Sequence, residues 1–177
     1  VIHTGLIHKA ERAEEIMGVL AHEIAHVTRH HATRNIVSSL GIFLIAQLLF
    51  GDFTGLIAVV ADNASFILTQ KFSRDLERDA DFTGLNYLYA AKIDPHGLVA
   101  FFKKLRKEAE ERGTAEIEEM LAILNTHPAT EERIAALEAE IESRGALQWQ
   151  PAPLDFKLFQ DRIRPYISEK EPSPALP

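Results

Sequence analysis

Two histidines one helical turn apart, with a glutamate directly after the first, lie near the start of this chain in the run His22-Glu23-Ile24-Ala25-His26. Residues four apart share one face of a helix, so the imidazoles of His22 and His26 can bind a single metal ion. A carboxylate beside the first ligand can reach a water molecule at that metal. This HExxH pattern predicts a helical zinc site with Glu23 as the general base.

The residues around the motif have the pattern of a helix that is buried on one side. Between residues 11 and 31, apolar side chains recur with a period of about 3.6 residues. They are Ile16, Met17, Leu20, Ile24 and Val27. Histidines in a helix that packs on a core are costly to bury unless their ring nitrogens have a partner, and a metal ion is such a partner. The alternative is an ordinary solvated helix in which the motif occurs by chance.

Zinc needs a third protein ligand, and the residues just after the motif do not supply one in the metzincin pattern HExxHxxGxxH. Arg29 and Ala32 occupy the positions of its glycine and third histidine. His30 would lie a further helical turn, roughly 5–6 Å, beyond His26. We therefore interpret His30 and His31 as structural or solvated residues.

A better candidate for the third ligand lies about fifty residues downstream, in a run of helix-forming composition over residues 72–81. Glu77 and Asp81 are four residues apart, so they face the same way on a helix. We expect Glu77 to complete a site of two histidines and one glutamate, and Asp81 to accept the free ring N–H of a ligand histidine. The alternative is that both are surface acids paired with Arg74 and Arg78.

Three motifs in order, HEIAHV, SRDLERDAD and NTHPAT followed by Arg133, resemble a gluzincin peptidase family. This family holds HtpX, the CAAX prenyl endopeptidases, the mitochondrial Oma-type proteases and the BepA-like proteins, and the resemblance covers about residues 1 to 143. It implies one zinc ion per chain and assigns a role to each matching residue: zinc ligands His22, His26 and Glu77, general base Glu23, Asp81 behind the ligands, and His127 at the cleft.

His127 is open to three interpretations. Near the metal it can stabilise the oxyanion of a tetrahedral intermediate, or it can fill the fourth metal position and hold the enzyme latent. Otherwise Thr126-His127-Pro128 is simply the turn before a helix over residues 130–144, with Thr130 as its N-cap. Arg133 is expected either to bind a substrate carboxylate at the cleft or to lie on the surface of that helix.

Composition narrows the classes of function. A chain of 177 residues with 46% hydrophobic content is long enough for one domain with a real core. The net charge of −7 and the lack of a basic stripe make nucleic acid an unexpected partner. The sequence has no cysteine, which leaves histidine and carboxylate as zinc ligands.

The chain starts at Val1 without an initiator Met or a signal-like region, so we expect a targeting segment to be missing from it. Together with the family resemblance, this favours a location in a bacterial cell envelope.

Residues 35–51 form a stretch of 17 uncharged residues, and apolar character resumes at 56–60 and 66–68. Seventeen residues is at the lower end of the range for a membrane-spanning helix. Residues 35–68 could therefore form a buried pair of core helices, an interfacial or cleft-covering lid, or a spanning pair. An interfacial lid would bring residues 35–68 into contact with a membrane surface.

We expect a mostly α fold of the α+β zincin type, with a small and incomplete β-sheet. The HExxH helix and the third-ligand helix would form the site. Only Val1–Thr4 offers a strand edge to which a peptide substrate could add. Asp94-Pro95 is expected to open a further helix. A catalytic domain would take residues 1–145, and residues 146–177 would form an extended tail with a short helix at 156–163.

Motif and resemblance together predict a zinc-dependent endopeptidase that acts on protein or peptide substrates. The resemblance suggests a role in quality control of unfolded or membrane-associated proteins. Two other classes stay open. One is a latent or chaperone-like zinc module in which His127 closes the fourth zinc position. The other is a membrane-attached interaction domain.

Overall fold

The computed structural model describes residues 4–50, 73–112, 127–145 and 147–166. These residues form helices and turns, and there is no strand among them. The elements are α1 (Thr4–Lys9), α2 (Ala13–Thr28), α3 (His31–Phe50), α6 (Arg74–Ala90), α7 (His96–Arg112), α9 (Glu131–Arg144), α10 (Phe156–Ile163) and the short 3-10 helix η1 (Arg164–Tyr166). The expectation of a mostly α fold is confirmed. The expected strand edge lies outside the described residues except for Thr4, which begins α1.

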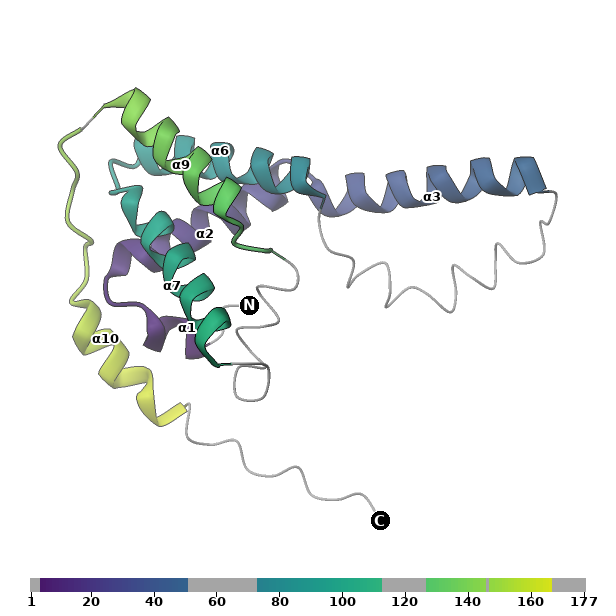
Figure 1. Ribbon diagram of the computed structural model, residues 1–177. Coiled ribbons are helices and arrows are strands. Elements are labelled where there is room, and N and C mark those ends of the chain that lie inside the picture. Colours follow the sequence, from purple (N-terminus) through teal and green to yellow (C-terminus); the bar gives the residue numbers. More distant parts are fainter. Residues whose placement is uncertain (1–3, 51–72, 113–126, 146, 167–177) are drawn as a thin grey trace, which may run out of the picture.

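Helix α2 packs against α6 and against α7, and both contacts bring backbone close to backbone (Figure 1). A Cβ atom added at Gly84 of α6 would lie 3.1 Å from the backbone nitrogen of His22. A Cβ atom added at Gly97 of α7 would lie 2.4 Å from the carbonyl carbon of Glu14, closer than any side chain can fit. These two glycines let α6 and α7 lie directly on the helix that carries the HExxH motif.

The hydrophobic core lies where α2, α6, α7 and α9 meet. Its most deeply buried apolar side chains are Leu85 and Leu88 of α6, Leu98, Phe101 and Leu105 of α7, and Ile134 and Leu137 of α9. Burying a side chain of this size stabilises the fold by about 1.5–3 kcal/mol. The core therefore holds the three helices around α2 in place, and with them the side chains that they carry.

Two members of the apolar stripe expected on α2 are not buried. Ile24 is 51% exposed and Val27 is 74% exposed, whereas Ala21 and Ala25 are buried. The prediction was wrong at these positions because α6 lies on the side of α2 that carries the small residues.

The helix expected over residues 11–31 is also interrupted. His30 has a φ of 55°, in the left-handed region, and a new helix begins at His31.

Side-chain caps open α7 and α9 where the sequence predicted them. Oδ1 of Asp94 accepts a hydrogen bond from the backbone N–H of His96, the first residue of α7. Oγ1 of Thr130 accepts one from the backbone N–H of Arg133. Each cap satisfies a backbone donor that the first turn of a helix leaves free. The cap at Thr130 also fixes the point at which the chain turns away from His127.

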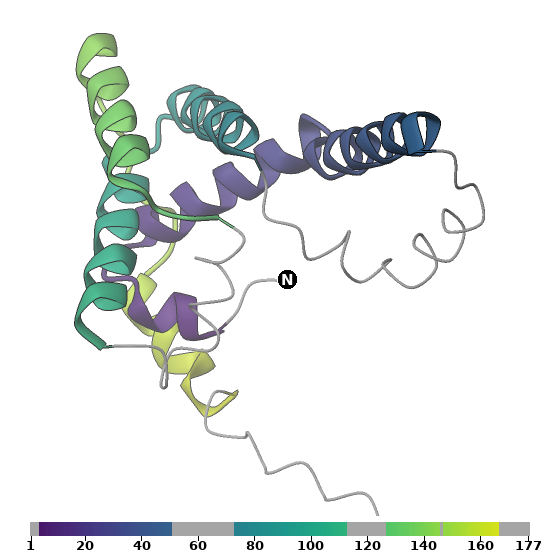
Figure 2. The same ribbon diagram turned by 45° about the vertical axis from the view of Figure 1, so that its right-hand side comes forward.

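Helix α3 points away from the other helices in both views (Figures 1 and 2). Val37, in its second turn, is 62% exposed, so this part of the 35–68 segment is not part of the core. Residues 51–68 lie outside the described part of the chain, so the choice between lid and spanning pair stays open there. Among the described helices, none combines the length and the apolar content that crossing a membrane requires.

The tail after Gly145 runs back along the helical body (Figure 1). The backbone N–H of Gln150 donates to the carbonyl of Lys92 at 2.8 Å. Farther on, the amide of Gln160 donates to the carbonyls of Ile7 and Ala10, each at 2.8 Å. The short helix expected at residues 156–163 is present as α10. The division into a domain and a tail at residue 145 stays a prediction.

Candidate metal centre

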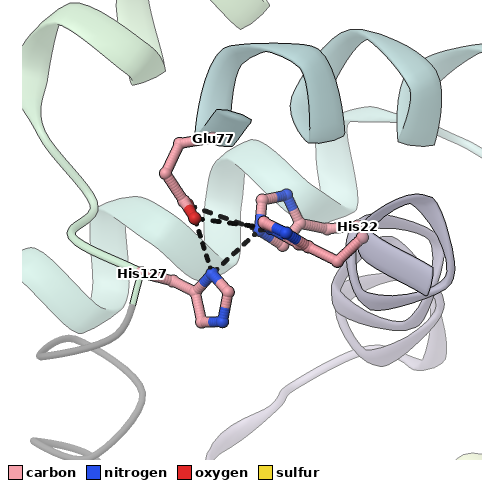
Figure 3. A group of neighbouring side chains, drawn as sticks. His22, Glu77 and His127 are labelled. Carbon is pink, nitrogen blue, oxygen red and sulfur yellow. Dashed lines mark hydrogen bonds and ion pairs between the residues drawn. The ribbon is translucent and has the colours of Figure 1, made fainter. Parts of the chain in front are cut away.

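Four side chains from three parts of the chain converge beside the contact between α2 and α6 (Figure 3). His22 and His26 project from α2, and Glu77 projects from the first turn of α6. His127 reaches in from the turn before α9. His22, His26 and Glu77 are buried, and His127 is half-buried at the rim. The four converging residues include His22, His26 and Glu77, the three that the motifs predicted as metal ligands.

Each of the four residues directs one nitrogen or oxygen atom at the others, and all four atoms lie within 4.8 Å of one another. The two Nε2 atoms of His22 and His26 are 3.1 Å apart. Nδ1 of His127 lies 3.4 Å from Nε2 of His22 and 2.8 Å from Oε1 of Glu77. The same Glu77 oxygen lies 3.3 Å from Nε2 of His26.

These distances fit a tetrahedral zinc ion. Bonds of about 2.0–2.1 Å from zinc to nitrogen or oxygen place neighbouring ligand atoms about 3.3 Å apart. The donors are imidazole and carboxylate, which zinc accepts, and the chain has no thiolate to compete. Oε2 of Glu77 is buried and lies 2.7 Å from Nη1 of Arg133, but it has no well-aligned hydrogen bond. A cation among these atoms would satisfy both the nitrogen pair and the buried carboxylate, so the residues present fit a metal ion.

Asp81 lies behind His22. Its Oδ1 atom is 2.9 Å from Nδ1 of His22, although off the direction of the ring N–H, so the contact is an ion pair more than a well-aligned hydrogen bond. Burial lowers the pKa of His22, but its contacts with Asp81 and Glu77 outweigh burial and raise the pKa to about 9. In the metal-free protein, His22 is therefore a cation at neutral pH and partly compensates the carboxylates around it.

Glu77 and Asp81 are not the surface acids of the alternative interpretation. Both are buried, and Arg78 instead forms a 2.6 Å ion pair with Glu132 at the surface. Burial raises the pKa of Glu77, but contacts with His127, His22 and His26 lower it well below its usual range. The carboxylate of Glu77 is therefore ionised, as a metal ligand must be.

Arg133 is buried next to these carboxylates, so the interpretation as a surface residue of α9 was wrong. Its Nε and Nη2 atoms donate to the two oxygens of Asp81, each at 2.7 Å. Its Nη1 atom donates to the carbonyl of Pro128 at 2.8 Å and lies 2.7 Å from Oε2 of Glu77. The guanidinium therefore connects the turn that carries His127 to Glu77 and Asp81 of α6. No spacing rule relates residue 133 to residue 81, which is why the sequence did not reveal this contact.

Glu23 follows His22 in the chain and lies at the edge of the cluster. Its side chain is 47% exposed, and its Oε1 atom lies 3.7 Å from Nε2 of His127. His127 thus has one ring nitrogen toward the ligand atoms and the other toward Glu23. The carboxylate that the HExxH pattern predicts as a base lies where solvent and a substrate can reach it.

The sequence pattern of Peptidase family M48 matches residues 1–141, a range that includes the four converging residues, Glu23 and Arg133. The chain belongs to peptidase family M48. The resemblance drawn from the three motifs is thereby confirmed.

Several relatives of this M48 chain have names that refer to proteolysis. The chain is 31% identical, over 92% of its length, to a putative beta-barrel assembly-enhancing protease of Vibrio cholerae serotype O1. It is 29% identical, over 76% of its length, to the beta-barrel assembly-enhancing protease of Escherichia coli. It is 31% identical, over 75% of its length, to the mitochondrial metalloendopeptidase OMA1 of Arabidopsis thaliana. The chain spans 34%, 29% and 26% of the lengths of these three relatives.

Proposed function

We propose that this chain is the catalytic domain of a zinc-dependent endopeptidase, with the domain formed by residues 1–145. The observation that carries the proposal is the convergence of His22, His26 and Glu77 on one point with Glu23 beside them. Three protein ligands and a neighbouring carboxylate are what a catalytic zinc site requires, whereas a purely structural site needs no base. Membership of a peptidase family with relatives named metalloendopeptidase supports the same class.

The residues divide the chemistry of peptide hydrolysis among them. When bound, the zinc ion supplies positive charge that acidifies a water molecule to a pKa of about 7 and polarises the peptide carbonyl. Glu23 accepts the proton of that water and delivers it to the leaving amine. Asp81 keeps Nε2 of His22 turned toward the ligand cluster. Arg133 donates to Asp81 and Pro128 and forms an ion pair with Glu77, so it acts as a positioning residue.

His127 gives the site a latent form. Its Nδ1 atom lies among the ligand atoms, so four protein ligands can surround the metal and close the position that water and substrate need. When the turn at His127 moves outward, the position opens, and the imidazole can then donate to the oxyanion of the reacting carbonyl. With zinc bound in this arrangement the proposed enzyme would be closed, and it would open for catalysis when the turn moves.

The substrates that fit this proposal are proteins or peptides, with no nucleic acid among the partners. A role in quality control of unfolded or membrane-associated proteins follows from the family resemblance. So does a location in a bacterial cell envelope, with contact to a membrane surface through residues 35–68. The names of the relatives called beta-barrel assembly-enhancing proteases agree with the proposed role and with the proposed location.

A pair of matched variants tests the proposal. Glu23→Gln keeps the shape of the side chain but cannot accept a proton, so it should bind one zinc per chain and cleave casein about 10²–10⁴-fold more slowly. Glu142→Gln, an exposed change on α9, should cleave at the wild-type rate and controls for the general effect of replacing a glutamate by glutamine. Elemental analysis after zinc reconstitution measures the metal. Wild-type protein without zinc would refute the metal site, and a fully active Glu23→Gln variant would refute the base.

A further inference from the structure

His31 is a fully buried histidine beside the metal centre that the proposed reaction does not use. It is the first residue of α3, and its exposed fraction is 0%, whereas its neighbour His30 is exposed. No pattern in the sequence distinguishes these two histidines. A buried imidazole needs partners for both ring nitrogens, so its contacts show what it does.

Both ring nitrogens of His31 have defined partners. Its Nδ1 atom lies 3.0 Å from Nδ1 of His26, and its Nε2 atom lies 3.0 Å from Oδ2 of Asp79. The same carboxylate oxygen accepts hydrogen bonds from Arg29 at 3.0 Å and Arg34 at 3.3 Å. His31 therefore forms a bridge between an aspartate on α6 and a ligand histidine on α2.

The chemistry of these groups fixes the direction of each hydrogen bond. Asp79 faces two guanidinium groups, so it is an ionised carboxylate that only accepts hydrogen bonds. Nε2 of His31 must then carry the proton and donate to Asp79. A neutral His31 has a lone pair on Nδ1, which accepts the proton of Nδ1 of His26. His26 is left with a lone pair on Nε2, the atom that faces Glu77 and His22.

We propose that Asp79 and His31 act as a relay that holds His26 in the tautomer and orientation that bind the metal. The inference rests on the metal site proposed above. Asp81 contacts His22 directly, whereas Asp79 contacts His26 through one intervening imidazole. Each histidine of the HExxH motif thereby has its own aspartate, and both aspartates belong to α6. His31 is a positioning residue, because it touches a ligand and not the metal or the substrate.

The test compares two substitutions of His31 with a change at its neighbour. His31→Leu fills the space but neither donates nor accepts, so it should weaken zinc binding by roughly 10–100-fold, the usual effect of losing a partner behind a ligand. His31→Gln can accept from His26 and donate to Asp79 through its amide, so it should restore most of the affinity. His30→Asn, which suits the positive φ at that position, should bind zinc as the wild type does. Competition with a chelator measures each affinity in the full chain.

A second measurement does not depend on any variant. In zinc-loaded wild-type protein labelled with ¹⁵N-histidine, ring correlation spectra distinguish the two tautomers. The relay requires His31 to carry its proton on Nε2. A proton on Nδ1 of His31, or wild-type affinity in a folded His31→Leu variant, would overturn the relay while leaving the zinc site intact. A wild-type chain that binds no zinc would overturn the proposed function itself, and with it the relay.

Discussion

Removing the guanidinium of Arg133 should be among the most damaging single changes to the metal-free protein. Arg133→Met keeps the length of the side chain and its packing against Phe102, whose ring centroid lies 4.8 Å from the guanidinium carbon. It removes the cation between Asp81 and Glu77. Both carboxylates are buried, at 3% and 2% exposure, so neither can be solvated in place of the lost contacts.

The expected cost follows from that burial. Breaking a buried ion pair by removing one partner costs about 3–5 kcal/mol, because the remaining charge stays in a poorly solvated place. Protonated His22 remains 2.9 Å from Asp81 and compensates part of the charge, so we expect about 3 kcal/mol. The matched control is Arg78→Met. Arg78 and Glu132 are 54% and 62% exposed, and an ion pair of that kind contributes about 0–1 kcal/mol.

Urea unfolding in the presence of EDTA, followed by circular dichroism at neutral pH, measures both values. With a slope of about 2 kcal/mol per M, the unfolding midpoint should fall by about 1.5 M for Arg133→Met and by less than about 0.5 M for Arg78→Met. Equal midpoints for the two variants would show that the buried guanidinium is not what compensates the acids of α6.

Two further predictions concern the histidines of the cluster. His127→Ala removes both the fourth ligand of the closed form and the oxyanion donor of the open form. We expect peptide hydrolysis to rise with zinc content unchanged, because opening of the metal position dominates. A loss of roughly 10²–10³ in kcat would show that the oxyanion contact contributes more than the closed form costs. Folding raises the pKa of His22 from 6.5 to about 9, so the protonated His22 stabilises the metal-free protein fully below pH 6.5. The free energy of unfolding of the metal-free protein should therefore fall as the pH rises from 6.5 to about 9. Urea unfolding on either side of that range checks the sign, and His22→Gln should remove the dependence.

The residues proposed as metal ligands could be picked out from the sequence because part of their geometry is local. His22 and His26 share a face of one helix, and Glu77 and Asp81 share a face of another, whatever the helices pack against. The cap at Thr130 is local for the same reason. Each of these features is present as soon as its helix forms, and the apolar periodicity of the chain is sufficient to predict the helix.

The apolar stripe on α2 shows where local reasoning ends. Periodicity identifies an apolar face on a helix, but it does not identify the neighbour that covers it. In the structure Gly84 of α6 lies close to the backbone of Ala21 and His22. Ala21 and Ala25 are buried, and Ile24 and Val27 are exposed. The position of α6 depends on contacts between residues about sixty positions apart, which one sequence does not reveal.

His31 shows the same limit at the site itself. In an uninterrupted helix, a residue five positions after His26 would lie about 140° around the axis and about 7.5 Å along it, too far to meet the same imidazole. The left-handed residue at His30 ends α2 and turns the chain, which brings Nδ1 of His31 to 3.0 Å from Nδ1 of His26. Asp79 likewise points away from the face that Glu77 and Asp81 share, yet it meets His31 because α3 begins there. The break in the helix, which lowers its regularity, is thus what allows one short segment of α6 to support both histidines of the motif.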